Sequence, residues 1–230
     1  MKVLAFDTTL AACSIALWAD GAVRAADFRL QQQGHAETLF PMIEAVCAQA
    51  GVALASVDAL AVTVGPGTFT GVRIGLAAAR GLRLALRGPV IPIPTLQAIA
   101  ATAARGRVGG AMLVVHDARR DEVYVQAFDG NLRPTTEPAV LPLAQVAEAW
   151  RDQKMILAGS GAPALAALWG GDAVIAGDPG ADGFGQPDAQ DFAGLAAEAL
   201  TRRGAGAFAD APMPVYLRAP DAKLPVPRAP

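Results

Sequence analysis

The chain alternates between apolar runs of strand length and longer stretches with helical spacing, a pattern that predicts an α/β protein. Leu39, Ile43 and Val46, for example, recur on one face of a helix that follows three apolar runs. In the first half the pattern predicts strands over residues 2–8, 13–19, 23–30, 58–64 and 90–93. It predicts helices over residues 36–50, 71–87 and 95–104.

The order of elements begins again near residue 110. The apolar run that ends in Asp117 repeats the first run of the chain, which leads into Asp7, and each is followed by a hairpin signal. A later strand leads into Gly159-Ser160-Gly161 and a helix, as an earlier strand leads into Gly65-Pro66-Gly67. A repeat of about half the chain predicts two similar α/β halves, each a mixed sheet with flanking helices.

Two halves in this order resemble the duplicated layout of the actin, hexokinase and Hsp70 superfamily, whose halves are RNase H-like. We therefore expect residues 1–106 to form the N-terminal half and residues 107–204 the C-terminal half. Residues 205–230 are a proline-rich tail, which we expect to pack partly on the body through Tyr216 and Leu217. The end of this tail, Leu224–Pro230, is expected to be extended or disordered.

The composition narrows the class of protein. Hydrophobic residues make up 53% of the chain and aromatic residues only 6%, so small aliphatic side chains must fill the core. The net charge of −2 gives no general attraction to nucleic acid. Two cysteines cannot form a disulfide framework, and no uncharged stretch free of glycine and proline is long enough to span a membrane. We expect a soluble, cytoplasmic protein with no membrane partner.

The stretch from Val62 to Arg80 is the strongest candidate for chemistry. A strand runs into Gly65-Pro66-Gly67 and then a helix, and this layout can offer backbone N–H groups to an anion. The spacing lacks the lysine of a P-loop, and Thr70 stands where the dinucleotide fingerprint needs glycine. The stretch is therefore either a phosphate loop of another kind or a tight structural turn, and the spacing favours the turn.

The end of the first strand offers a second set of polar groups. Asp7, Thr8 and Thr9 could hold Mg²⁺ and phosphate, or could form a turn by bonding to nearby N–H groups. Asp117 has the corresponding place in the second half, in a charged loop that would equally suit a solvated surface cluster. The candidate nucleotide site, which we expect to be vestigial, comprises Asp7, Thr8, Thr9, Gly65, Gly67 and Asp117.

The helix predicted over 71–87 carries two stripes. One consists of small residues that would let another helix approach closely. The other consists of arginines, with no acidic residue in the sequence between Asp58 and Asp117 to balance them. The arginines either face solvent or meet an acidic partner or RNA. The expected partner interface comprises His35, Leu39, Ile43, Gly71, Arg73, Gly75, Ala79 and Arg80.

Histidine chemistry has little support in this chain. His35 and His116 are far apart, and neither has the spacing of a metal-ligand pair or of a Ser-His-Asp triad. The nucleophile elbow G-x-S-x-G does not occur. We therefore expect no catalytic residue and no metal site.

Five segments together resemble one bacterial family, TsaB, also called YeaZ. They keep their order along most of the chain and read LAFDTTLAACSIAL, HAETLFPMIEAV, GPGTFTGVRIGLAAARGL, DARRDEVYVQAF and PVYLRAPDA. The resemblance implies a subunit that binds a TsaD-like transferase, with a TsaE-like ATPase as third member. Their product is N6-threonylcarbamoyladenosine at position 37 of tRNAs that read ANN codons.

The resemblance also implies which functions are absent. TsaD-like proteins carry an H-x-x-x-H metal pair soon after a similar loop, and the matching stretch here, Ile93–Ile99, has no histidine. The chain therefore resembles a catalytically silent scaffold that forms a homodimer when alone and meets tRNA indirectly. No cofactor is expected to bind tightly, and ATP or ADP at the interface with the partner is the remaining option. The alternative is an active ATP-dependent kinase or ATPase of the same fold.

Overall fold

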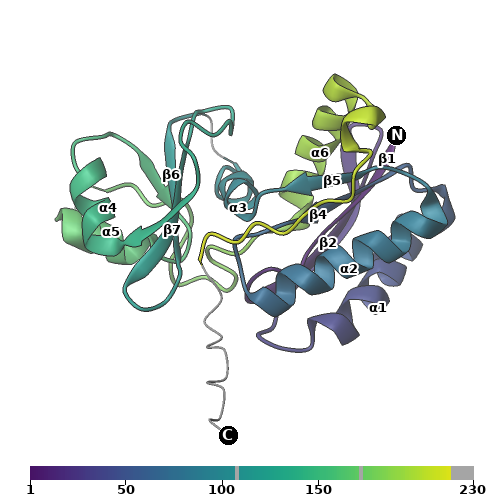
Figure 1. The fold of residues 1–230 in the computed structure, drawn as a ribbon, viewed down its shortest axis with the longest axis horizontal. Helices are drawn as coiled ribbons and strands as arrows, with labels where there is room; N and C mark the ends of the chain where they lie inside the picture. Colours follow the sequence, from purple (N-terminus) through teal and green to yellow (C-terminus); the bar gives the residue numbers. More distant parts are fainter. Residues whose placement is uncertain (107–108, 171–172, 219–230) are drawn as a thin grey trace, which may run out of the picture.

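The computed structural model describes residues 1–106, 109–170 and 173–218, which form two lobes (Figure 1). Helix α3 (Thr95–Ala103) lies between the lobes. The expectation for Leu224–Pro230 concerns residues outside these ranges. Within them, no helix is both long and apolar enough to cross a bilayer.

The first lobe is built on a five-stranded mixed sheet in the order β3-β2-β1-β4-β5. Strand β1 is antiparallel to β2 and parallel to β4, so it lies at the centre of the sheet. Phe6 pairs with Val62 in this register, which places the carboxyl end of β1 beside that of β4. The strands are β1 (Lys2–Asp7), β2 (Ala12–Ala19), β3 (Ala22–Leu30), β4 (Ala59–Thr63) and β5 (Val90–Ile93).

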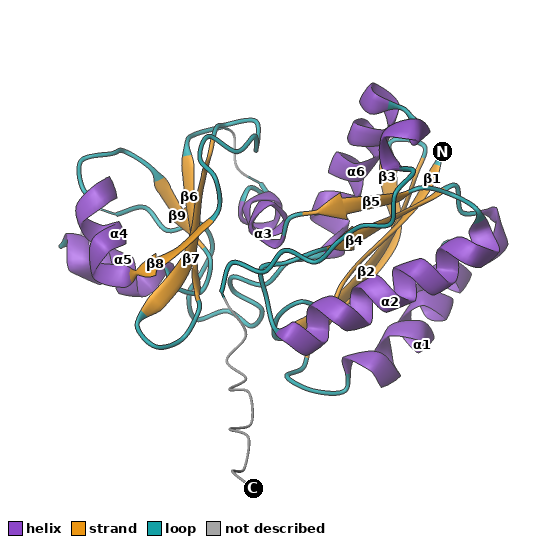
Figure 2. Ribbon diagram, in the orientation of Figure 1, coloured by secondary structure: helices purple, strands orange, loops and turns teal. Residues whose placement is uncertain are grey.

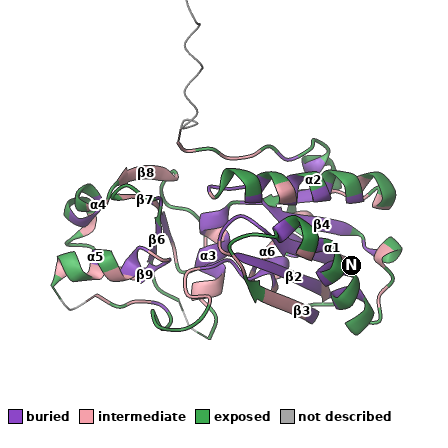
Figure 3. Cartoon of the chain, turned by 90° about the horizontal axis from the view of Figure 1, so that it is seen from below, coloured by how far each residue is buried: buried purple, intermediate pink, exposed green. Residues whose placement is uncertain are grey.

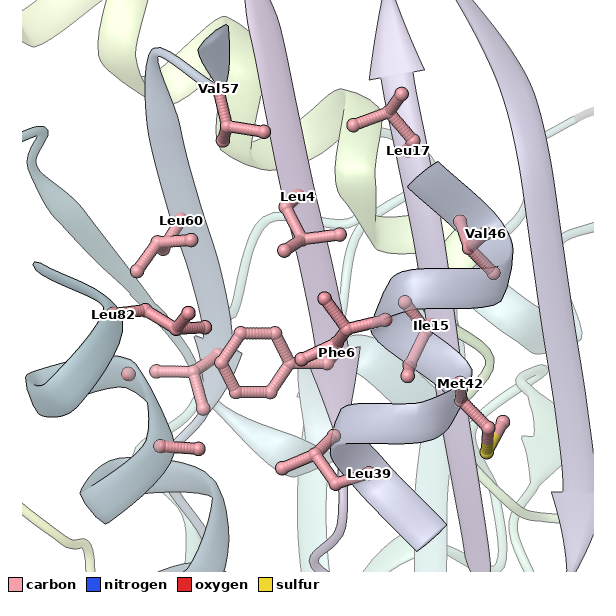
Figure 4. Packing of buried hydrophobic residues seen from close by; sticks show 14 of the residues in the cluster. Leu4, Phe6, Ile15, Leu17, Leu39, Met42, Val46, Val57, Leu60 and Leu82 are labelled. Atoms are coloured by element: carbon pink, nitrogen blue, oxygen red, sulfur yellow. The ribbon is translucent and has the colours of Figure 1, made fainter. Parts of the chain in front are cut away.

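Two helices, α1 (His35–Gln49) and α2 (Phe69–Leu86), cover one face of this sheet (Figure 2). Leu4 and Phe6 of β1 are fully buried and pack with Leu39 from α1 and Leu82 from α2 (Figure 4). Each large aliphatic or aromatic side chain buried in this way contributes about 1.5–3 kcal/mol. The outer faces of both helices are exposed (Figure 3).

The second lobe has a four-stranded sheet in the order β8-β7-β6-β9. Its strands are β6 (Met112–Asp117), β7 (Glu122–Phe128), β8 (Ala139–Pro142) and β9 (Ile156–Ala158). One face packs against α4 (Leu143–Trp150) and α5 (Ala162–Trp169). The other face packs against α3, where Leu96 and Ile99 meet Met112 and Val114.

The strand orders of the two lobes correspond, because β3-β2-β1-β4 and β8-β7-β6-β9 have the same pairing directions. Two mixed sheets with flanking helices confirm the α/β class expected from the internal repeat. The first lobe has one strand more, β5, and longer helices.

Helix α6 (Ala189–Arg203) belongs to the first lobe, although the sequence division placed residues 107–204 together in the second. Its buried face, which includes Phe192 and Ala196, packs on small side chains of β1 and β4. The physical reason is that the central parallel strands are apolar on both faces, so a helix must cover the face opposite α1 and α2. A short turn, η2 (Ala205–Phe208), follows α6; the other 3₁₀ turn, η1 (Leu54–Ser56), precedes β4.

Replacing either of two glycines of α2 by alanine should change the free energy of unfolding in opposite directions. A Cβ at Gly71 would lie 2.1 Å from the carbonyl oxygen of Thr8, whereas a Cβ at Gly81 would have no atom within 4 Å. We expect Gly71→Ala to lower the free energy of unfolding by about 1–3 kcal/mol through overpacking. Gly81→Ala should raise it by about 0.5–1 kcal/mol. Urea unfolding of both variants measures this, and equal effects would contradict the close packing at Gly71.

Candidate functional site

Asp7 lies at the carboxyl end of β1 and is fully buried. Its Oδ1 accepts hydrogen bonds from the Thr9 amide at 3.1 Å and from the Thr9 hydroxyl at 2.6 Å. The hydroxyl of Thr63, at the end of β4, donates to the same oxygen at 2.5 Å. Asp7 therefore joins the loop after β1 to the end of the neighbouring strand.

The second carboxylate oxygen of Asp7, Oδ2, is buried without a hydrogen-bond partner among the described residues. Removal from water disfavours the charged form and raises the pKa of Asp7 to about 6, although the hydrogen bonds from Thr63 and Thr9 act in the opposite direction. The buried carboxyl of Asp7 therefore binds a proton at a higher pH than an exposed aspartate does.

The loop Gly65-Pro66-Gly67 is closed by other parts of the same chain. Gly65 has a φ of +106°, and a Cβ on it would lie 2.5 Å from the carbonyl oxygen of Val215. A Cβ on Gly67 would lie 2.6 Å from the carbonyl oxygen of Thr9. The glycines thus allow two backbone segments to approach the loop, where a phosphate loop would leave open space for its ligand.

One N–H group in this loop and another directly after it also have partners within the protein. The Gly65 amide donates to the Thr95 hydroxyl at 3.1 Å, and the Thr68 amide donates to the Thr9 carbonyl at 2.8 Å. The Thr68 hydroxyl accepts from the Gly71 amide at 3.1 Å and so caps α2. These hydrogen bonds give the segment the geometry of a tight turn between β4 and α2.

In the second lobe, the residue that corresponds to Asp7 is Asp117, at the end of β6. Asp117 is exposed, and its carboxylate accepts from the Arg119 amide at 2.8 Å. Its neighbour His116 is buried, which lowers the pKa of the imidazole to about 4 and leaves it neutral at neutral pH. The Nδ1 of His116 lies 3.1 Å from the Ser160 hydroxyl. Asp117 does not join Asp7 in a common hydrogen-bond network within the described part of the chain.

The glycine loop of the second lobe is also packed against its own strand. A Cβ on Gly159 would lie 2.4 Å from the carbonyl oxygen of Val115. A Cβ on Gly185 would lie 2.5 Å from the amide nitrogen of Ser160, so the segment after residue 176 covers this loop. The glycines of both loops therefore allow neighbouring backbone segments to pack closely against them.

The expected partner interface needs a correction, because six of its eight residues face the interior of this chain. His35 is buried, with Nε2 3.1 Å from the Leu10 carbonyl oxygen. A Cβ on Gly75 would lie 2.9 Å from the Thr8 hydroxyl, so the small residues fit α2 against the loop after β1. The buried six are His35, Leu39, Ile43, Gly71, Gly75 and Ala79.

Arg73 and Arg80 are exposed on α2, but their partner lies in the same chain. Arg73 donates to the Tyr216 hydroxyl at 3.2 Å, and its guanidinium lies 3.4 Å from the centre of the Phe69 ring. Arg80 donates to the Pro212 carbonyl at 3.1 Å. The sequence analysis expected the tail to pack on the body through Tyr216, which stacks on Phe69 here; it did not anticipate that arginines of α2 bind the tail.

A cavity of about 830 Å³ lies between α3 and the glycine-rich segment 176–190. Arg105, on its wall, donates to the Asp188 carboxylate at 2.6 Å and also pairs with Asp191. Asp7 and Thr9 do not line it. In the three described ranges, no group of three or more His, Cys, Asp or Glu side chains is placed to hold a metal ion.

The buried carboxyl of Asp7 should make stability depend on pH. Its pKa in the folded protein, about 6, exceeds the ordinary value of 3.8, so its stabilising contribution is fully present below pH 3.8 and is lost as pH rises through 6. Relative to Asp7→Asn, the parent should lose on the order of 3 kcal/mol between pH 4 and pH 7. Denaturant unfolding at several pH values measures the difference. Parallel curves for the parent and Asp7→Asn would contradict the assignment.

Comparison with known proteins gives a consistent set of relatives. The family model described as "TsaD: tRNA N6-adenosine threonylcarbamoyltransferase" matches residues 29–175. The protein TsaB of Escherichia coli strain K12 is 43% identical over 124 residues, covering 54% of this chain and 53% of that protein. This chain thus spans about half the length of that curated relative.

Solved structures extend the likeness to nearly the whole chain. YeaZ from Pseudomonas aeruginosa is 34% identical, with a TM-score of 0.80 over 94% of this chain and 99% of that one. The activator of 2-hydroxyisocaproyl-CoA dehydratase from Clostridium difficile has a TM-score of 0.50 at 10% identity, over 88% of this chain and 97% of that one, and shows the fold alone. From the family match and the YeaZ likeness together, the chain belongs to the TsaD-like family and to its TsaB, or YeaZ, group.

Proposed function

We propose that the chain is a non-catalytic subunit of the system that makes N6-threonylcarbamoyladenosine in tRNA, and that it binds a TsaD-like transferase. The names of its relatives support the reaction, and the family resemblance supports adenosine 37 of tRNAs that read ANN codons as the target. The same resemblance supports a TsaE-like ATPase as a further partner, indirect contact with tRNA, and a place in the cytoplasm.

The observation that carries the non-catalytic role is the closed state of both glycine loops. Backbone from Thr9 and Val215 occupies the space beside Gly65 and Gly67, where a phosphate would need to enter. Helix α3, which follows the first loop, has no histidine and buries Leu96 against the second lobe. ATP or ADP would therefore bind, if at all, together with groups from the partner.

The outer face of α1 and α2 is the surface that suits the partner. Phe40 on α1 and Leu84 on α2 are 45% and 84% exposed, although both are large and apolar. Large apolar side chains that are exposed on two neighbouring helices suit burial against a second copy of this face, which supports a homodimer that the transferase would replace.

The isolated chain should neither hydrolyse ATP nor transfer threonylcarbamoyl to tRNA, because the phosphate loops are filled by protein. The measurement is ATP turnover and tRNA modification by the purified chain, with and without Mg²⁺, and then after addition of the TsaD-like and TsaE-like proteins of the same organism. Modification should appear only in the complete mixture. Turnover by the isolated chain that Asp7→Ala abolishes would instead support an ATP-dependent kinase or ATPase.

A single charge on the outer face of α2 should weaken the complex. Leu84→Asp places a carboxylate in the centre of a desolvated contact, where such changes cost about 2 kcal/mol or more, equivalent to at least a thirtyfold loss of affinity. Leu168→Asp is the matched control, because Leu168 is 47% exposed on α5 of the other lobe. Calorimetric titration with the TsaD-like protein measures both. Equal affinities for the parent and Leu84→Asp would place the partner elsewhere.

A further inference from the structure

We propose that residues 209–218, here called the strap, tie the two lobes together and limit the opening between them. The strap leaves the first lobe after η2, runs along α2 and reaches the loop between β6 and β7 of the second lobe (Figure 1). This inference concerns the isolated chain and does not depend on the function proposed above.

Arginines of α2 hold the first part of the strap by its backbone. Arg83 donates to the Ala209 carbonyl at 2.5 Å, and Arg80 donates to the Pro212 carbonyl at 3.1 Å. Because the acceptors are backbone carbonyls, the stripe of positive charge needs no acidic residue opposite it. A charged donor also makes a stronger hydrogen bond than a neutral one.

The middle of the strap is fixed against the loop that ends β4. The Val215 amide donates to the Val64 carbonyl at 2.7 Å, and the absent side chain of Gly65 leaves room for the Val215 carbonyl. Tyr216 stacks on Phe69 of α2 with ring centres 5.8 Å apart. These contacts attach the strap to the first lobe at a point two residues before its last described residue.

Arg218 attaches the strap to the second lobe. Its guanidinium donates to the Ala118 carbonyl at 2.9 Å and forms an ion pair with Glu122, and its side chain is only 22% exposed. The three residues after Ala118, numbered 119–121, have φ values of +64°, +57° and +59°, which L-residues rarely adopt. Such a loop needs support from outside itself, and Arg218 supplies part of it.

The strap limits movement of the lobes because its two attachment points, Tyr216 and Arg218, are close together along the chain. Two residues of extended chain span at most about 7 Å, so Tyr216 and Arg218 cannot move far apart. The lobes are otherwise joined by α3 with the chain that follows it and by the segment that leads into α6. While both ends of the strap are bound, the β6–β7 loop cannot move away from the start of α2.

The distance between the lobes tests this directly. Spin labels on Glu44→Cys of α1 and Glu148→Cys of α4, both at exposed positions, report it by pulsed electron paramagnetic resonance; excess unlabelled chain removes contributions from dimers. We expect one narrow distribution in the labelled parent. Arg218→Gln should give a wider distribution with a longer mean distance. Arg202→Gln, which breaks only an exposed ion pair on α6, is the control and should match the parent.

A second anchor variant and a second measurement keep the result interpretable. Tyr216→Ala, which removes the stack on Phe69, should widen the distribution in the same way, and the double variant with Arg218→Gln should add little, because the two anchors act in series. In Arg218→Gln, hydrogen exchange of the Val215 amide should become faster by roughly tenfold, as expected when a local contact opens. Circular dichroism establishes that each variant is folded. An unchanged distance distribution in folded Arg218→Gln, or fully additive effects of the two anchors, would overturn the strap.

Discussion

The close approach of the loop after β1 to the start of α2 organises the first lobe. The carbonyl oxygens of Thr8 and Thr9 occupy the space where side chains on Gly71 and Gly67 would otherwise lie. The Thr9 carbonyl also accepts from the Thr68 amide and hydroxyl, so the same oxygen holds the first turn of the helix. The loop after β1 and the start of α2 are therefore held together by the same few backbone atoms.

Much of the fold followed from the sequence, because strand length, helical spacing and the repeat after residue 110 are local signals. The position of α6 could not be predicted, because the pattern of an amphipathic helix shows that one face is buried but not which sheet covers that face. The small residues of α2 were ambiguous for the same reason. Gly75 permits close approach equally to another subunit or to the chain's own Thr8, and only the three-dimensional packing distinguishes the two.

The candidate site was recognised in part. The sequence identified Asp7 and the glycine loop, and in the structure both lie in hydrogen-bonded turns at the ends of β1 and β4. The contribution of the arginines to the tail contact was not predicted, because Arg80 and Arg83 bind carbonyl oxygens, which every residue carries and no sequence pattern marks. Because the sequence places no acidic residue near these arginines, an acidic partner or RNA was one of the expected explanations for them. Backbone carbonyls of the same chain accept the hydrogen bonds of Arg80 and Arg83 instead.

Helix α6 also has a consequence for the order of events during synthesis. The first lobe consists of residues 1–103 together with a helix that begins at Ala189, so its second face stays uncovered until most of the chain has left the ribosome. The second lobe is one continuous segment and has all of its strands and flanking helices earlier. The N-terminal lobe is therefore expected to be the later of the two to complete its core, the reverse of the usual order in which N-terminal units fold first.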